Sequence, residues 1–121
     1  MASSSALKRK LSGSTDGKAI LITRIATAGD TIHTAVAGTT AGTFDEIWLW
    51  AYNGHTANVQ LTIEFGGVTV PDQNIITTIP WKSGLVLVVS GLILQHEMVV
   101  KAFASVANVV TISGFINAIT D

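Results

Sequence analysis

Residues 44–52 read FDEIWLWAY and predict a β-strand with two chemically different faces. Side chains alternate across a strand with a period of two, so neighbouring residues point to opposite faces of the sheet. The aliphatic side chains on one face are Ile47, Leu49 and Ala51, and the aromatic side chains on the other are Trp48, Trp50 and Tyr52. We expect an all-β core here. For the aromatic face three alternatives stay open: core, contact with another subunit, or a platform on which sugars stack.

The dipeptide Asn53-Gly54 follows this strand and predicts a tight hairpin turn, because a type I′ turn needs residues that accept positive φ. Residues 57–65, ANVQLTIEF, then alternate between apolar and polar side chains. We expect the apolar side chains on the core and the polar ones in water or at a polar contact. The two stretches together predict an antiparallel pair of strands.

The rest of residues 18–121 continues the pattern of short, β-branched stretches separated by Gly, Pro, Asn and Asp. We count about eight strands at short spacing, and no stretch has a sustained helical period with caps. Residues 85–89, LVLVV, are continuously apolar and predict a strand buried on both faces. The pattern indicates a single antiparallel β-sandwich over 18–121, with a jelly roll as the first topology and another Greek-key sandwich as the second.

Residues 1–17, MASSSALKRKLSGSTDG, predict an extended N-terminal arm in front of the sandwich. The stretch is rich in Ser and Gly, and its two leucines, Leu7 and Leu11, are four residues apart. That spacing allows a short helix formed on contact with a partner. The alternative is a tail without fixed structure, which is common at chain ends.

Composition and charge point to a surface that meets other subunits. The chain has 121 residues, enough for one domain, and only 12% of them are charged, against about 25% in a typical soluble domain. Either a Thr- and Ser-rich surface or burial against other copies explains this value. Residues 1–24 carry a net charge of +4 and residues 25–121 a net charge of −5. A basic arm of this kind can dock on an acidic neighbour.

We find no constellation of residues that predicts catalysis, and we expect a protein that is not an enzyme and has no cofactor. The chain has no cysteine, its three histidines lack metal-ligand spacing, and no G-x-S-x-G motif is present. Asp45 and Glu46 are adjacent on a strand and therefore point apart rather than converging as an acid–base pair. Gly66-Gly67 is not followed by a helix, so it predicts a turn and not a phosphate site.

Nucleic acid and membrane are not expected as partners. The basic cluster Lys8-Arg9-Lys10 is short and the remaining chain is acidic, which is weak evidence for phosphate contacts. The most apolar stretch, residues 85–94, is shorter than the roughly 20 residues that a membrane-spanning helix needs. The N-terminal basic residues are not followed by the apolar run of a signal peptide. We therefore expect a soluble protein that is made in a cytoplasm.

Several segments, taken in order, resemble short structural proteins encoded beside the capsid genes of tailed bacteriophages. They are LKRKLSGSTDGK (7–18), TIHTAVAGTT (31–40), FDEIWLWAYN (44–53), LTIEFGG (61–67), SGLVLVVSGLIL (83–94) and VVKAFASVANVVTISGFINAI (99–119). The resemblance covers most of the chain and implies a virion protein: a capsid decoration (cement) protein, or else a neck or head–tail joining component. It implies a homo-oligomer, a trimer or dimer, bound to the major capsid protein on the capsid surface.

The candidate partner-binding residues lie in two groups. The first is the basic and apolar part of the arm, Leu7, Lys8, Arg9, Lys10 and Leu11, and the second is a set of three tryptophans, Trp48, Trp50 and Trp81. The competing hypothesis is a carbohydrate-binding sandwich module that uses Trp48, Trp50 or Trp81. No catalytic, cofactor-binding or metal residue is proposed.

Overall fold

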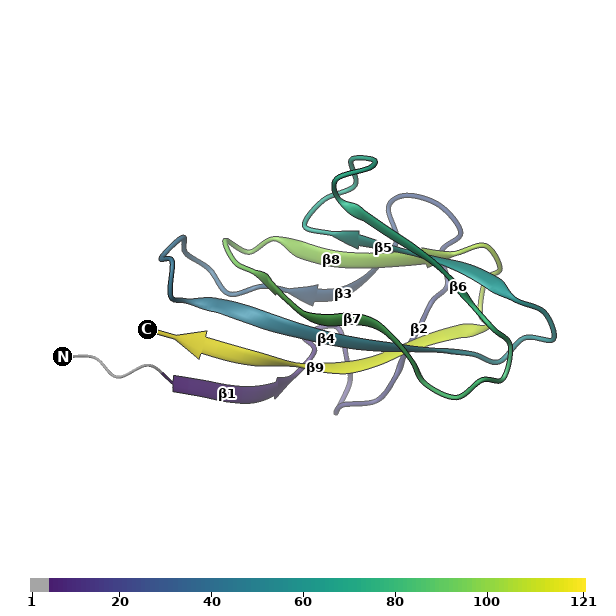
Figure 1. The fold of residues 1–121 in the computed structure, drawn as a ribbon, viewed down its shortest axis with the longest axis horizontal. Coiled ribbons are helices and arrows are strands. Elements are labelled where there is room, and N and C mark those ends of the chain that lie inside the picture. The colour runs from purple at the N-terminus through teal and green to yellow at the C-terminus, as the bar shows by residue number, and fades with distance from the viewer. Residues whose placement is uncertain (1–4) are drawn as a thin grey trace.

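The computed structural model describes residues 5–121, and over this range the chain forms nine β-strands and no helix (Figure 1). The strands are β1 (Ser5–Lys10), β2 (Ile20–Leu21), β3 (Asp30–Thr34), β4 (Phe44–Asn53), β5 (Val59–Phe65), β6 (Asn74–Ile79), β7 (Val86–Leu94), β8 (Val99–Ala104) and β9 (Val110–Thr120). The all-β expectation is confirmed. Within the described range, no helical segment has the length and apolarity required to cross a membrane.

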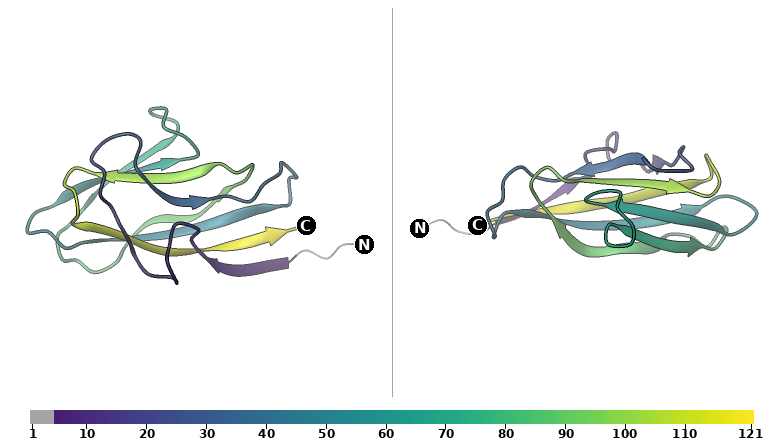
Figure 2. Two further views of the ribbon diagram at one scale, coloured as in Figure 1. Left: turned by 180° about the vertical axis from the view of Figure 1, so that it is seen from behind. Right: turned by 90° about the horizontal axis from the view of Figure 1, so that it is seen from above.

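The strands form two antiparallel sheets that lie against each other as two layers (Figure 2). The first sheet has the order β1-β9-β4-β7, with β2 also paired to β9, and the second sheet has the order β3-β8-β5-β6. The pairs β1–β9, β3–β8, β4–β7 and β5–β6 are nested, each enclosing the next in the sequence. This nested pairing is the topology of a jelly roll, the first of the two arrangements that the sequence left open.

The core lies between the two sheets and is almost entirely aliphatic. Burial alternates along β4, where Ile47, Leu49 and Ala51 are completely buried and the aromatic residues between them are partly exposed. The second sheet contributes Leu61 and Ile63 of β5, which are also completely buried. Each such Leu or Ile side chain contributes roughly 1.5–3 kcal/mol to the hydrophobic stabilisation. The predicted aliphatic face of residues 44–52 is therefore confirmed.

The predicted hairpin at Asn53-Gly54 is wrong, because β4 and β5 belong to different sheets. Asn53 is completely buried, and its Nδ2 donates to the carbonyl oxygens of Ala57 and Ile79 at 3.0 and 2.9 Å. Gly54 lacks the positive φ that a type I′ turn requires. The Asn53 side chain holds the chain where it crosses between the sheets, and a local turn pattern does not reveal such a crossing.

The prediction that residues 85–89 are buried on both faces is also wrong. β7 is an outer strand of the first sheet and pairs only with β4. Three of its apolar side chains, Leu87, Leu92 and Ile93, are 46–54% exposed. A continuous apolar run is typical of a central strand, but periodicity alone does not distinguish it from an outer strand whose edge is covered by something else.

The predicted arm is part of the sandwich over the residues that the structure describes; its first four residues, 1–4, lie outside them. Every residue of β1 is paired with β9, from Ser5 with Thr120 to Lys10 with Phe115. Leu11 follows directly and is 1% exposed in the core. The stretch around Leu7 is thus a strand, and neither a contact helix nor a tail without fixed structure describes residues 5–17.

Candidate interaction surface

Three aromatic rings lie together on the outer face of the first sheet, the face turned away from the core. Trp48 and Trp50 come from β4 and Phe115 from β9, and we call these three residues the aromatic cluster. The ring centroids are 6.3 Å apart for Trp48–Trp50, 6.4 Å for Trp48–Phe115 and 5.9 Å for Trp50–Phe115. The ring planes differ by only 14–28°. All three side chains are partly exposed, so the cluster forms part of the surface.

Charged and polar side chains hold the aromatic cluster at its borders. The Lys8 Nζ lies 4.3 Å from the centroid of the Phe115 ring, a cation–π contact from the neighbouring strand β1. Glu46 Oε1 accepts hydrogen bonds from Trp48 Nε1 at 2.8 Å and from Asn117 Nδ2 at 2.9 Å. These two hydrogen bonds, that from Trp48 first, lower the pKa of Glu46 below its ordinary value. The surface therefore presents flat apolar rings beside one fixed cation and one fixed anion.

Gly91 and Gly114 allow Trp48 to pack closely against the neighbouring strands, because a larger residue at either position would clash with it. A Cβ on Gly91 of β7 would lie 3.0 Å from Cζ2 of Trp48, so the indole ring packs directly over the Gly91 backbone. A Cβ on Gly114 of β9 would lie 2.0 Å from the Trp48 carbonyl oxygen, so only glycine permits the close approach of β9 to β4. The cluster is consequently a feature of the packed sheet and not of mobile side chains.

The structure brings three of the predicted partner-binding residues together and separates the others. Lys8, Trp48 and Trp50 meet at the aromatic cluster. Trp81 is 50% exposed but lies elsewhere, in the turn between β6 and β7, with the Nζ of Lys82 6.0 Å from its ring. Phe115, Glu46 and Asn117 were missed, because pairing of β4 with the distant β9 has no local signal in the sequence.

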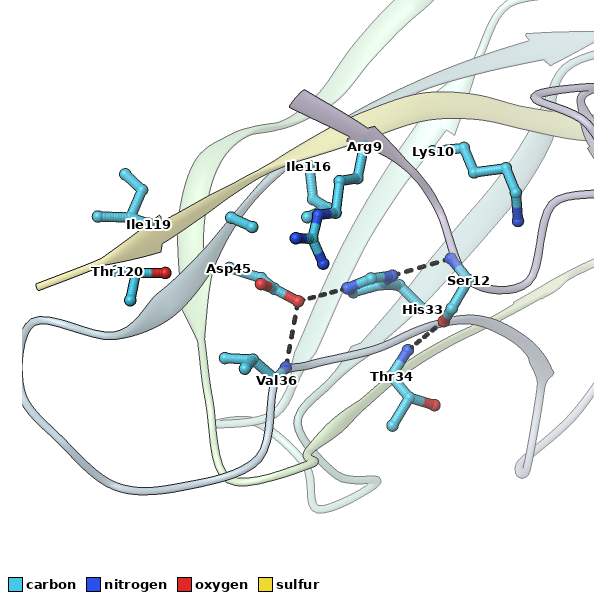
Figure 3. A pocket seen from close by; sticks show the side chains of 11 residues that line it. Arg9, Lys10, Ser12, His33, Thr34, Val36, Asp45, Ile116, Ile119 and Thr120 are labelled. Carbon is cyan, nitrogen blue, oxygen red and sulfur yellow. Dashed lines mark hydrogen bonds and ion pairs between the residues drawn. The ribbon is translucent and has the colours of Figure 1, made fainter. Parts of the chain in front are cut away.

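The remaining predicted residues of the N-terminal stretch have three different surroundings. Leu7 is 53% exposed on β1, whereas Leu11 is in the core and cannot reach a partner from there. The Nζ of Lys10 donates to the carbonyl oxygen of Ser14 at 3.2 Å. Arg9 lines a hollow of about 700 Å³ at the sandwich end that carries the C-terminus (Figure 3).

A buried histidine–aspartate pair forms one wall of this hollow. His33 Nε2 lies 2.7 Å from Asp45 Oδ2, and both residues are almost completely buried. The backbone N–H of Ser12 donates to His33 Nδ1 at 3.0 Å. Nδ1 is therefore the acceptor, and Nε2 carries the hydrogen that it donates to Asp45. Figure 3 draws both contacts as dashed lines.

This pair resembles part of a catalytic triad, but the third member is not in place. A triad histidine accepts a serine hydroxyl on one ring nitrogen, whereas both ring nitrogens of His33 are occupied, Nδ1 by the Ser12 N–H and Nε2 by Asp45. The geometry is that of a structural tie between the sheets. The expected divergence of Asp45 and Glu46 is confirmed, since Asp45 faces this interior and Glu46 the outer face of the first sheet.

Two further carboxylates hold the loop of residues 23–30. Glu64 is 1% exposed, and its carboxylate accepts from the Thr27 hydroxyl at 2.8 Å and from the Gly29 N–H at 2.7 Å. Of the two surroundings expected for the polar face of residues 57–65, water or a polar contact, Glu64 has the polar contact; Thr62 is buried as well. The loop covers that part of the strand and supplies the donors that a buried carboxylate needs.

Asp30 binds the other end of the same loop. Its carboxylate accepts from the backbone N–H groups of Thr23 and Arg24, at 2.7 and 3.0 Å, and from the Thr23 hydroxyl at 2.8 Å. Burial by itself raises the pKa of Asp30, but the hydrogen bonds from Thr23 and Arg24 outweigh it, so the pKa is lowered overall. The loop is therefore fixed by an ionised carboxylate at neutral pH.

Within residues 5–121, no group of three or more His, Cys, Asp or Glu side chains is arranged to hold a metal ion. Comparisons of the chain with protein families, with curated proteins and with solved structures gave no match.

Proposed function

We propose that the protein is a capsid decoration (cement) protein of a tailed bacteriophage, which forms homo-oligomers and binds the outside of the shell. The observation that carries this proposal is the partly exposed aromatic cluster on a sheet face that no described part of the chain covers. Large aromatic side chains are enriched in the centres of protein–protein interfaces.

The jelly-roll fold is compatible with this proposal without proving it. Jelly rolls occur in viral shell proteins and in lectins, and one fold hosts many functions. The few charges on the outer face of the first sheet are held in place, since Glu46 accepts two hydrogen bonds and Lys8 lies over Phe115. Fixed charges and rigid rings lose little conformational entropy when a partner covers them.

The experiment is co-sedimentation of the purified protein with capsids that lack it. The wild-type protein is expected to sediment with the capsids, and Trp50→Ala to lose at least ten-fold in affinity because Trp50 lies in the cluster. Ile25→Ala is the control. Ile25 is 63% exposed and lies in the loop between β2 and β3, which is hydrogen-bonded to Glu64 of the second sheet. Thermal melts establish that both variants fold. A folded Trp50→Ala variant that binds as well as wild type rules out the cluster as the contact.

Copy number in purified virions separates the shell from the neck. Hundreds of copies relative to the major capsid protein support a decoration protein. About six or twelve copies move the protein to the neck or head–tail joint, and absence from virions removes the structural proposal.

A carbohydrate-binding module is the second candidate, and one observation favours it. Nearly parallel rings next to a carboxylate and an amide, here Glu46 and Asn117, provide both stacking surfaces and hydrogen-bonding groups for a sugar. A glycan array supports this candidate if binding disappears in a folded Trp50→Ala variant. An array without any binding removes it.

A further inference from the structure

The exposed apolar side chains are concentrated along one side of the sandwich. Twelve large apolar side chains are exposed in residues 5–121, and nine of them lie between Val68 and Met98. This stretch contains β6 and β7, which form the outer strands of the two sheets on this side. It carries only three charged residues, Asp72, Lys82 and Glu97. A surface of this composition is unusual for a protein that is monomeric in solution.

Strand β7 is the centre of this apolar side. Among residues 5–121 it has a partner strand on one side only, β4, so its other edge presents backbone N–H and C=O groups that a further strand can pair with. Outer strands are commonly protected by charged residues, proline or β-bulges; residues 83–95 contain no charge and no proline, and the irregularities of β7 are limited to the two register shifts against β4. The side chains of Leu87, Leu92 and Ile93 are 47, 46 and 54% exposed. The strand thus offers both backbone hydrogen bonds and apolar contacts.

The absence of charge on β7 indicates which kind of strand can pair with it. A charged strand laid against β7 would lose water without gaining a counter-charge, so the partner has to be an uncharged apolar strand. The opposite edge of the same sheet is β1, which carries Lys8, Arg9 and Lys10 and is therefore a poor partner for β7 of another copy. The β7 strand of a second copy meets the requirement, because it is neutral and equally long.

We propose that two copies of the chain pair antiparallel along their β7 strands and form a two-fold symmetric dimer. Such an interface is self-complementary and closes, whereas pairing of β7 with β1 would continue from copy to copy. The register of β7 against β4 shifts at Val88 and at Gly91, which leaves Val89 and Ser90 regularly paired with Leu49 and Trp48. Ser90 is the midpoint of residues 85–95, so the two-fold axis passes beside it.

The dimer deepens the proposed function, and only its effect on binding to a capsid shell rests on that function. Directly paired residues share a face of the sheet, so Leu87 lies on the same face as Trp50. Antiparallel pairing about an axis perpendicular to the sheet joins the two first sheets into one. Both aromatic clusters then face the same way, and a shell would be bound through two contacts at once, which raises the overall affinity.

The first test is the mass of the purified protein in solution without capsids, by sedimentation velocity across a concentration series. Wild type is expected at twice the chain mass of 12.7 kDa. Ile93→Lys is expected at the mass of one chain, and the control Ile25→Lys, at a similarly exposed isoleucine away from β7, at twice that mass. A monomeric wild type, or an oligomer that Ile93→Lys leaves intact, overturns the proposal. Thermal melts establish folding of each variant.

The second test uses the absence of cysteine from the chain. Ser90→Cys introduces a single exposed thiol, and directly opposed residues of antiparallel strands are close enough for a disulfide. At protein concentrations at which the protein is dimeric, mild oxidation of Ser90→Cys is expected to give a covalent dimer. The control Thr39→Cys, at an exposed position in the loop between β3 and β4, is expected to stay uncrosslinked. Equal crosslinking of both variants overturns the proposed axis. Neither test involves capsids, so a failed dimer and failed capsid binding are separate results.

Discussion

His33 Nε2 and Asp45 Oδ2 lie 2.7 Å apart in the interior and connect the two sheets, because His33 belongs to β3 and Asp45 to β4. Asp45 Oδ2 also accepts a hydrogen bond from the Val36 N–H at 3.1 Å. His33 in turn accepts from the Ser12 N–H, so one buried pair connects three separate stretches of chain. Removing one partner of such a pair lowers the stability of the fold, because the other partner is left buried without a hydrogen bond.

We expect Asp45→Ala to destabilise the fold strongly. Removal of the carboxylate leaves the His33 ring and the Val36 N–H without an acceptor, at about 1–3 kcal/mol for each buried group. Urea unfolding measures the loss. The control Asp72→Ala removes an exposed aspartate and is expected to change the free energy of unfolding by less than about 0.5 kcal/mol. Equal effects of the two substitutions would show that the His33–Asp45 contact is absent in solution.

Leu7 and Leu11 provide a matched pair for the N-terminal stretch. Leu11→Ala is expected to cost about 2–5 kcal/mol, because Leu11 is 1% exposed and its removal leaves a cavity. Leu7→Ala is expected to be nearly neutral, because Leu7 is 53% exposed. Thermal or urea unfolding separates the two. A neutral Leu11→Ala would mean that residues 5–17 behave as a detached arm after all.

Two glycine substitutions test the paths of β4 and β9. Gly114→Ala is expected to cost about 1–3 kcal/mol or more, because the new methyl group meets the Trp48 carbonyl oxygen and forces the strands apart. Gly54→Ala is expected to cost little, since its φ is not positive and its nearest neighbour is a ring atom of Tyr52 at 3.3 Å, which can move. A large loss in Gly54→Ala would instead indicate the type I′ hairpin. Urea unfolding checks both.

Acidification is expected to weaken the hold of Asp30 on its loop. The pKa of Asp30 is lower in the folded protein than the ordinary value of 3.8. The stability it contributes is therefore complete above pH 3.8 and is lost as the pH falls towards the folded-state pKa. Urea midpoints between pH 5 and pH 2.5 are expected to fall more steeply for wild type than for Asp30→Asn. Parallel curves would show that the hydrogen bonds to Thr23 and Arg24 do not depend on the charge.

The faces of β4 were predictable from the sequence because its alternation is complete. Every second residue from Asp45 to Asn53 is buried, and the side chains between them lie outward. The sandwich class followed from the same kind of pattern in several short stretches. Both inferences use only the geometry of a single strand, in which successive side chains point in opposite directions.

The pairing of strands was not predictable in this way, and the one wrong turn, the unidentified partners of Glu64 and the missed Phe115 share that cause. Asn53 is buried where the chain crosses between sheets, so Asn53-Gly54 is not a hairpin although its composition favours one. Glu64 is buried because a loop far away in the sequence supplies its hydrogen-bond donors. Phe115 joins the aromatic cluster through the pairing of β9 with β4. Each of these features depends on residues that are distant in the sequence.

The position of β9 has a consequence for how the protein reaches this fold. β9 lies between β1 and β4 and also pairs with β2, yet it is the last strand in the sequence. β1 has no partner other than β9, and Ser5 has to find Thr120. During synthesis the first sheet therefore cannot form until β9 has left the ribosome. Folding dominated by such distant pairings takes on the order of milliseconds to seconds. Until it is complete, the apolar strands β4 and β7 are exposed and can aggregate with those of neighbouring chains.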